Sequence, residues 1–206
     1  MYPKGLCLLW QLCSYMDAHR KHYGTSGEHS LTEEDVNKLL AVINHLEDEV
    51  LIRLAVSTGI RREDIVAIPL SGVDFEQGIV SYYETKKKRP WKANFGGTTL
   101  TVLQKYRRTL PSGARYLFPK RTNPAKHISG RTAYNILQRW LIAAKLKSRP
   151  FHALRSTCIK LCQKRGWLPE QTMALTGDTL RTIQEHYSTP TAEEMRAVSS
   201  DKAILK

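Results

Sequence analysis

His152 and Arg155, in the stretch "FHALRS", open a helical pattern in the most basic part of this 206-residue chain. Residues three apart on a helix share a face, so an imidazole and a guanidinium would point at one spot. A guanidinium matches the paired oxygens of a phosphate, and an imidazole beside it can donate a hydrogen bond or move a proton. The spacing alone does not say what that spot holds, and taken by itself His152 is read as a capping or core histidine.

Three further stretches carry residues of the same kind. Arg61 follows a helix stop in "STGIRRED", a cluster of lysines ends a predicted strand in "YYETKKKRPW", and Tyr187 lies near the chain end in "TIQEHYS". Each has an ordinary interpretation when taken alone. Arg61 can form a surface salt bridge, the lysine cluster can be a phosphate-attracting turn, and Tyr187 can be an amphipathic residue at a helix end.

The distribution of charge favours a polyanionic partner. Residues 1–84 carry seven basic and 13 acidic side chains, whereas residues 85–206 carry 25 basic and six acidic ones. No acidic residue lies between Glu84 and Glu170, a stretch with 21 lysines and arginines. Solvated surfaces usually mix both signs, so we expect this part of the chain to bind nucleic acid. An anionic membrane would more usually be signalled by a short amphipathic cluster, and no apolar run is long enough to span a membrane.

The cysteines favour a reduced protein without a metal site. The chain has four of them, at Cys7, Cys13, Cys158 and Cys162. The spacing of Cys158 and Cys162 in a helical pattern suits two small buried groups. A zinc site would need further ligands at matching spacings, which the sequence lacks. We therefore predict no metal and an intracellular location.

These side chains need elements to hold them, and the sequence predicts an α+β domain that is mostly helical. Thr32 is expected to cap a helix that runs to about residue 43, with acids in its first turn. From Val73 the period changes to two, which predicts a hairpin around Gly78 and a third strand at "WKANF", in one small antiparallel sheet. The other predicted helices span residues 6–22, 48–57, 62–69, 99–108, 129–145, 152–165, 169–176, 179–187 and 191–200.

In their order, the motifs resemble the catalytic domain of the tyrosine recombinase (phage integrase) family. An arginine after T-G, a lysine on a hairpin, H-x-x-R opening a later helix and a tyrosine near the end follow one another along the chain. "SLTEEDVNKLLAVI" is similar to the usual start of that domain, "RYLFP" to a mid-domain signature and "LTGDTLRTIQEHYS" to the tyrosine segment. The resemblance covers residues 30–190 and depends on the order and spacing of short motifs.

The resemblance implies a site-specific DNA recombinase or integrase that works through a 3′-phosphotyrosine. Tyr187 matches the nucleophile, and His152 matches the histidine of H-x-x-R. Arg61 and Arg155 match the pair that holds the non-bridging phosphate oxygens and stabilises charge in the transition state. A nucleophile that stays attached to the phosphate conserves the bond energy, so no cofactor is implied.

The basic residues of the second half would complete the site. Lys86 matches the hairpin lysine that protonates the leaving 5′ oxygen, with Lys87 and Lys88 as alternatives. The partner implied is double-stranded DNA. The expected DNA-binding residues are exposed cations of the hairpin and of later segments: Lys87, Lys88, Arg89, Lys92, Lys126 and Arg131.

One position departs from the family pattern. Asp178 stands in "TGDT", where the family usually has a histidine or tryptophan. An ionised aspartate is a poor donor and repels a phosphate. Three outcomes are open: a lower rate, substitution by another donor such as His186, or impaired activity. A structural role is also available, since Asp178 or Thr179 can cap the helix that delivers Tyr187.

We expect residues 1–28 to form a short helical extension and linker, and residues 29–206 to form the catalytic domain. By resemblance, the N-terminal helical domain that closes over DNA would be absent, in a short natural form or in a fragment. The enzyme would act as a tetramer on paired sites and be associated with DNA in the cytoplasm or nucleoid. The alternatives are a degenerate recombinase that binds DNA without cutting it and a type IB topoisomerase-like enzyme that relaxes DNA.

Overall fold

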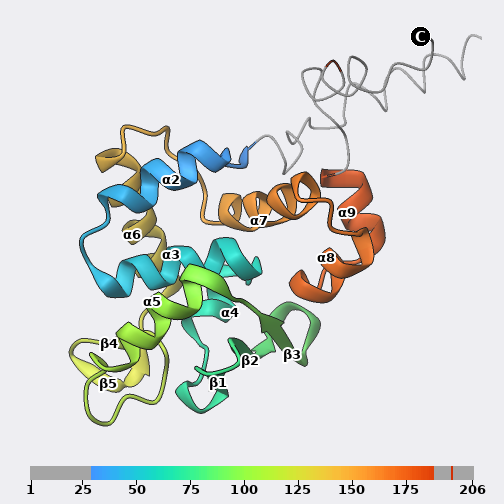
Figure 1. Cartoon of the computed structure of the whole chain (residues 1–206). Coiled ribbons are helices and arrows are strands. Elements are labelled where there is room, and N and C mark those ends of the chain that lie inside the picture. The colour runs from blue at the N-terminus through green and yellow to red at the C-terminus, as the bar shows by residue number, and fades with distance from the viewer. Residues whose placement is uncertain (1–28, 188–195, 197–206) are drawn as a thin grey trace, which may run out of the picture.

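The computed structural model describes residues 29–187 and residue 196, with only the backbone of residues 184–187. It confirms the predicted α+β, mostly helical architecture (Figure 1). The helices are α2 (Glu33–Val42), α3 (Leu46–Thr58), α4 (Arg62–Val66), α5 (Gly97–Arg107), α6 (Gly130–Ala143), α7 (His152–Lys164), α8 (Pro169–Thr176) and α9 (Leu180–Tyr187). The strands are β1 (Val73–Asp74), β2 (Ile79–Glu84), β3 (Arg89–Asn94), β4 (Pro119–Lys120) and β5 (Asn123–His127).

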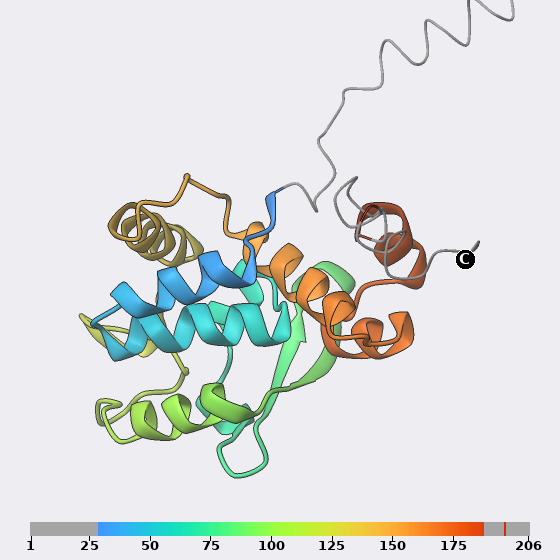
Figure 2. The same cartoon turned by 45° about the horizontal axis from the view of Figure 1, so that its top comes forward.

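Helix α3 lies at the centre of the hydrophobic core. It packs against α2, α5 and α7, and Figure 2 shows α2 and α5 on either side of it. Its apolar side chains are buried on several faces: Val50, Leu51, Ile52, Leu54 and Ala55. Burial of this kind supplies most of the stability of a helix in a small domain.

Several local predictions are confirmed. Thr32 forms a capping box with Asp35, in which each side chain accepts a hydrogen bond from the backbone N–H of the other, at 3.1 and 3.2 Å. Strands β1, β2 and β3 form an antiparallel sheet in that order. Cys158 and Cys162 are buried free thiols.

The prediction of a single sheet is wrong, because β4 and β5 form a second antiparallel hairpin. Strand β5 reads "NPAKH", which has no alternation of apolar and polar residues, and its pairing with β4 shifts register. A two-stranded hairpin of polar residues leaves no periodic signal in a sequence. The helices predicted over residues 6–22 and 191–200, and the proposed extension over residues 1–28, lie outside the described residues.

The connections between elements bring distant segments together. Helix α3 ends at Thr58 with Gly59 as its C-cap, and Arg61 immediately precedes α4. The β2–β3 hairpin turns through a short 3-10 helix, η3 (Thr85–Lys87), and β3 contacts α8. Figure 1 shows α8 beside this hairpin and α7 leading from the core toward α8 and α9. The hairpin, the α3–α4 junction, α7 and the α8–α9 turn therefore meet on one side of the domain.

Candidate active site

Four of the predicted catalytic side chains line one cavity of about 510 Å³. Arg61 comes from the α3–α4 junction, Lys86 from the hairpin turn, and His152 and Arg155 from the first turn of α7. A cavity of this volume is in the usual range for ligand sites. Segments up to 94 positions apart in the sequence thus present three cations and an imidazole to the same space.

Arg155 is the most buried member of this group, with only 2% of its surface exposed. Its guanidinium forms a bidentate ion pair with the Asp178 carboxylate, with Nε 3.1 Å from Oδ2 and Nη2 2.7 Å from Oδ1. It also donates to two carbonyl oxygens, from Nη1 to Gly59 and from Nη2 to Thr176 at 2.8 Å. These contacts fix the orientation of the guanidinium.

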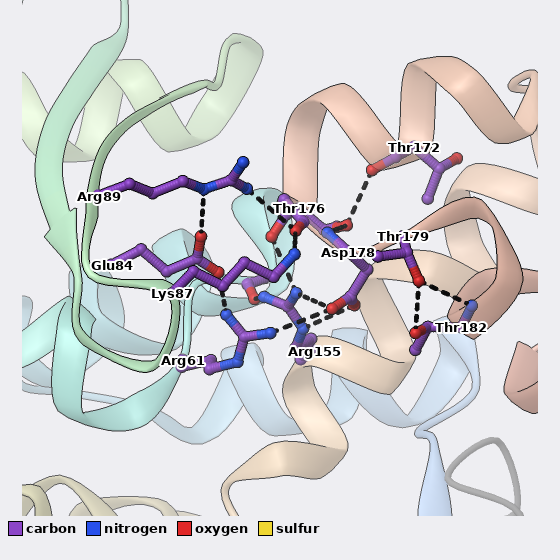
Figure 3. Close-up of polar contacts among 12 residues, drawn as sticks. Arg61, Glu84, Lys87, Arg89, Arg155, Thr172, Thr176, Asp178, Thr179 and Thr182 are labelled. Carbon is purple, nitrogen blue, oxygen red and sulfur yellow. Dashed lines mark hydrogen bonds and ion pairs between the residues drawn. The ribbon is translucent and has the colours of Figure 1, made fainter.

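Asp178 links the two arginines. Arg61 Nη2 lies 3.1 Å from Asp178 Oδ1, the same oxygen that receives Arg155 Nη2 (Figure 3). Asp178 is 8% exposed, and it does not serve as the helix cap. Thr179 takes that role, because its Oγ1 accepts the Thr182 N–H at 3.2 Å at the start of α9.

Glu84 forms a second carboxylate bridge. It is fully buried, and its two oxygens accept hydrogen bonds from Arg61 Nη1 and from Arg89 Nε, the latter at 2.8 Å. Burial alone would raise the pKa of the Glu84 carboxyl, but the hydrogen bonds from Arg89 and Arg61 outweigh it and hold that pKa below its ordinary value. Glu84 is therefore a carboxylate that aligns Arg61 from the side opposite Asp178.

Sequence reasoning did not identify Glu84, although a signal for it exists. Val80, Tyr82 and Glu84 alternate along β2 and are all buried, so the carboxylate lies on the apolar face of the strand. A buried carboxylate in such a pattern requires a cationic partner. That requirement marks it as part of an ion-pair network.

The hairpin lysines separate into different environments. Lys86 lines the cavity, whereas Lys87 Nζ donates to the carbonyl of Gly177. Lys88 is an exposed turn residue with a positive φ of 50°. Arg89 turns inward as well, because Nη2 lies 3.3 Å from the Gly177 oxygen and its guanidinium stacks 4.0 Å from the Trp91 ring centroid. Of the three lysines, Lys86 is the one that reaches the two arginines' cavity.

The remaining predicted DNA-binding residues are Lys88, Lys92, Lys126 and Arg131, and all four are exposed. Lys87 and Arg89 are half-buried, and their polar contacts hold the hairpin to the α8–α9 turn. The role of these six residues in DNA binding stays a prediction. Tyr187 is the last residue of α9, and its side chain, like that of His186, lies outside the described residues.

Four cations and two carboxylates make up the polar cluster around the cavity: Arg61, Lys87, Arg89, Arg155, Glu84 and Asp178. The cavity lining adds the cations Arg62 and Lys86 and the carboxylates Glu63 and Asp64, so six cations face four carboxylates. An excess of fixed cations in a sheltered cavity favours an anionic ligand. Among the described residues, no cluster of three or more histidine, cysteine, aspartate or glutamate side chains is suited to a metal ion, and no helix could cross a bilayer.

His152 titrates in a cationic environment. Partial burial lowers the pKa of its imidazole from the ordinary 6.5, the nearby Arg155 charge lowers it further, and Asp178 opposes both.

We expect NMR titration of the His152 ring to give a pKa below 6.5, and a still lower pKa in Asp178→Asn. Because the pKa of His152 is lower in the folded state than in the unfolded state, the unfolded state binds more protons between these two pKa values. The contribution of His152 to the free energy of unfolding is therefore lost as the pH falls from 6.5 to the folded-state pKa. His152→Gln should remove that part of the pH dependence, and a ring pKa at or above 6.5 would contradict the assignment.

Gly59, at the α3–α4 junction, packs closely against the side chains of Thr176 and Arg155. Its φ is +65°, and an added Cβ would lie 3.1 Å from Thr176 Cγ2 and 3.5 Å from Arg155 Cγ. We expect Gly59→Ala to lower the free energy of unfolding in urea by about 1–3 kcal/mol through backbone strain, plus a further loss from crowding. Gly113→Ala is the matched control, because φ is +79° there but nothing lies within 4 Å of the added Cβ. Equal losses in the two variants would show that crowding at Gly59 is unimportant.

Comparison with known proteins gives a consistent result. The profile described as "Phage integrase family" matches residues 29–192. Among curated proteins, tyrosine recombinase XerA of Pyrococcus furiosus is 27% identical over 181 residues, which cover 86% of this chain and 63% of that protein. XerA of Pyrococcus horikoshii is 24% identical over 177 residues, covering 85% of this chain and 62% of that protein. The chain thus spans less than two thirds of the length of these relatives.

The fold is also similar to solved structures. A crystal structure of XerA recombinase aligns with a TM-score of 0.75 at 16% identity, covering 86% of this chain and 64% of that one. XerH site-specific recombinase bound to its difH substrate aligns with a TM-score of 0.66 at 18% identity, covering 84% and 54%. A lambda integrase dimer bound to a COC′ core site aligns with a TM-score of 0.60 at 20% identity, covering 73% and 57%.

Proposed function

Because the chain belongs to the phage integrase family, we propose that it is a site-specific DNA recombinase that cuts and rejoins strands through a 3′-phosphotyrosine. The observation that carries this proposal is the meeting of Arg61, Lys86, His152 and Arg155 in one cavity. Arginine side chains in such a cavity match the geometry of a phosphodiester. The cavity also lies beside the turn that leads into the helix ending at Tyr187.

The residues divide the chemistry as follows. Arg61 and Arg155 bind the non-bridging oxygens and stabilise the charge that develops as the phenolic oxygen of Tyr187 attacks phosphorus. Lys86 donates a proton to the departing 5′ oxygen, and His152 donates a hydrogen bond or takes the tyrosine proton. The new phosphorus–oxygen bond replaces the broken one, so the 5′-hydroxyl of a partner strand can reverse the step.

The proposed assembly follows from the same family. Its partner is double-stranded DNA, held in part by exposed lysines and arginines of residues 85–206, and the active form is a tetramer on paired sites. A structure of lambda integrase is described as a tetramer bound to a Holliday junction. We further propose that residues 29–206 form the catalytic domain, that residues 1–28 extend it, and that the protein is located with DNA inside the cell.

Trapping on a nicked duplex tests this proposal. Cleavage close to a nick releases a short fragment that diffuses away, so the religation step is lost and the covalent adduct accumulates. We expect a DNA–protein adduct that survives denaturation, and a single modified peptide containing Tyr187. Strand exchange between two duplexes, in contrast to simple relaxation of a supercoiled circle, then separates a recombinase from a topoisomerase-like enzyme.

A degenerate recombinase that binds DNA without cutting it is the second candidate. The feature that favours it is Asp178, an acidic residue that contacts both phosphate-binding arginines. Tight DNA binding without any adduct in the trapping experiment, across a series of random duplexes, would support this candidate over the first.

A further inference from the structure

We infer that Asp178 competes with the DNA phosphate for Arg61 and Arg155 and so holds the site in an inhibited state until DNA displaces it. The inference rests on the proposed function, because it assigns both arginines to the scissile phosphate. It concerns a carboxylate that lies where the family pattern has a histidine or tryptophan. Asp178 would therefore act on the reaction through the two arginines, without contacting the reacting atoms.

The donors of Arg155 are almost fully engaged in the structure. A guanidinium has five N–H groups. Those of Arg155 make four contacts, of which two go to Asp178, one to the Gly59 carbonyl and one to the Thr176 carbonyl. The carbonyl contacts are part of the backbone framework. A phosphate can therefore form a two-pronged contact with Arg155 only if the Asp178 carboxylate gives up its place.

The donors of Arg61 are also occupied by carboxylates. Its Nη1 is held by Glu84 and its Nη2 by Asp178 at 3.1 Å. One Asp178 oxygen thus receives both arginines, as a non-bridging phosphate oxygen would (Figure 3). A carboxylate and a phosphate present similar pairs of oxygens to a guanidinium fork. In this arrangement Asp178 is an internal substitute for the anionic substrate.

The position of Asp178 in the chain allows it to leave. It lies in the turn between α8 and α9, two residues before Leu180 begins the latter helix. The preceding residue, Gly177, is fixed to the hairpin by Lys87 and Arg89, which both donate to its carbonyl. We therefore expect its displacement to be confined to the side chain and this turn, with α8 unchanged.

The alternative is that Asp178 merely aligns the arginines and helps catalysis. The two possibilities predict opposite changes in phosphate affinity when the Asp178 charge is removed. If Asp178 competes, removing its charge strengthens binding of a phosphate. If Asp178 only aligns, removing its charge weakens that binding, because Arg61 and Arg155 lose their orientation.

The experiment titrates inorganic phosphate against the full chain and follows the rise in melting temperature, which reports binding to the folded state. For Asp178→Asn we expect an apparent dissociation constant about tenfold lower than that of the wild type, the size of one charged hydrogen bond. Asp178→Ser should behave in the same way, and Asp178→Glu should stay close to the wild type. For each variant the increase in melting temperature caused by phosphate is compared, not the melting temperature itself, because loss of Asp178 lowers the melting temperature even without phosphate.

Glu63→Gln is the matched control. It changes the net charge by the same amount and lines the same cavity, but the ion pair of Glu63 is with Arg62. We expect less than about a twofold change in phosphate affinity, because the Glu63 carboxylate is exposed and pairs with Arg62 instead of with Arg61 or Arg155. The gain in Asp178→Asn must also disappear when Arg61→Met is added, which shows that the phosphate binds at the arginine pair.

The outcomes separate this inference from the proposed function. Unchanged or weaker phosphate binding in Asp178→Asn and Asp178→Ser, a gain no larger than in Glu63→Gln, or a gain that survives Arg61→Met would each overturn the inference. Formation of the covalent adduct on nicked DNA tests the proposed function separately. Faster adduct formation in Asp178→Asn supports both, whereas no adduct in any variant rejects the function and leaves the phosphate result to be judged on its own.

Discussion

Replacing Tyr187 with phenylalanine is expected to abolish the covalent DNA adduct. The change removes only the phenolic oxygen that would attack phosphorus, and no other group of the chain is assigned to that step. Loss of a nucleophile lowers a rate by at least about a thousandfold. The measurement is the yield of adduct on a nicked duplex, while DNA affinity, followed by fluorescence anisotropy, should stay within about twofold because phosphate contacts dominate it.

Tyr134→Phe provides the matched control for this result. Tyr134 lines the same cavity, and the substitution removes the same atom from a side chain of the same kind. We expect adduct formation to persist in this variant. Persistence of the adduct in Tyr187→Phe, or its loss in Tyr134→Phe alone, would mean that the nucleophile has been assigned to the wrong tyrosine.

The order of short motifs allowed the convergence of the site to be predicted from the sequence. His152 and Arg155 were expected to share a face of a helix, and the structure places both in one cavity with Arg61 and Lys86. The secondary structure around them was also predictable, because capping residues, helix stops and the change to a period of two mark each element. These signals are local, and so they can be read from neighbouring residues.

The ion pairs of the site could not be predicted in this way. Asp178 and Arg155 are 23 positions apart, and Arg61 and Glu84 are also 23 apart. Which carboxylate meets which guanidinium depends on how the hairpin packs against α8, and no local pattern encodes that. The β4–β5 hairpin was missed for a related reason, since its polar strand pairs through the backbone and carries no alternation.

The second large effect is expected at Arg155, where substitution should damage stability and activity together. Arg155→Met keeps an unbranched apolar side chain but leaves Asp178, which is 8% exposed, without its two-pronged partner. The carbonyl oxygens of Gly59 and Thr176 also lose their donor. Breaking a buried ion pair from one side costs about 3–5 kcal/mol. Urea unfolding of the variant should show a loss of that size, and the adduct should disappear at temperatures where circular dichroism shows a folded chain.

Two companion variants separate the causes of this loss. Arg61→Met removes a side chain that is 21% exposed, so we expect a smaller loss of about 1–2 kcal/mol. In Arg155→Met the Asp178 carboxylate keeps only Arg61 as a cationic partner. Adding Asp178→Leu removes this incompletely neutralised carboxylate, so the double variant should be more stable than Arg155→Met alone. If the double variant is instead less stable, the penalty comes from lost packing of the arginine side chain, not from the carboxylate that Arg155 no longer neutralises. A loss below about 1 kcal/mol in Arg155→Met would show that these contacts do not hold Arg155 in the fold. In that case the N–H groups of Arg155 would not be occupied as described, and the proposed competition between Asp178 and phosphate would lose its basis.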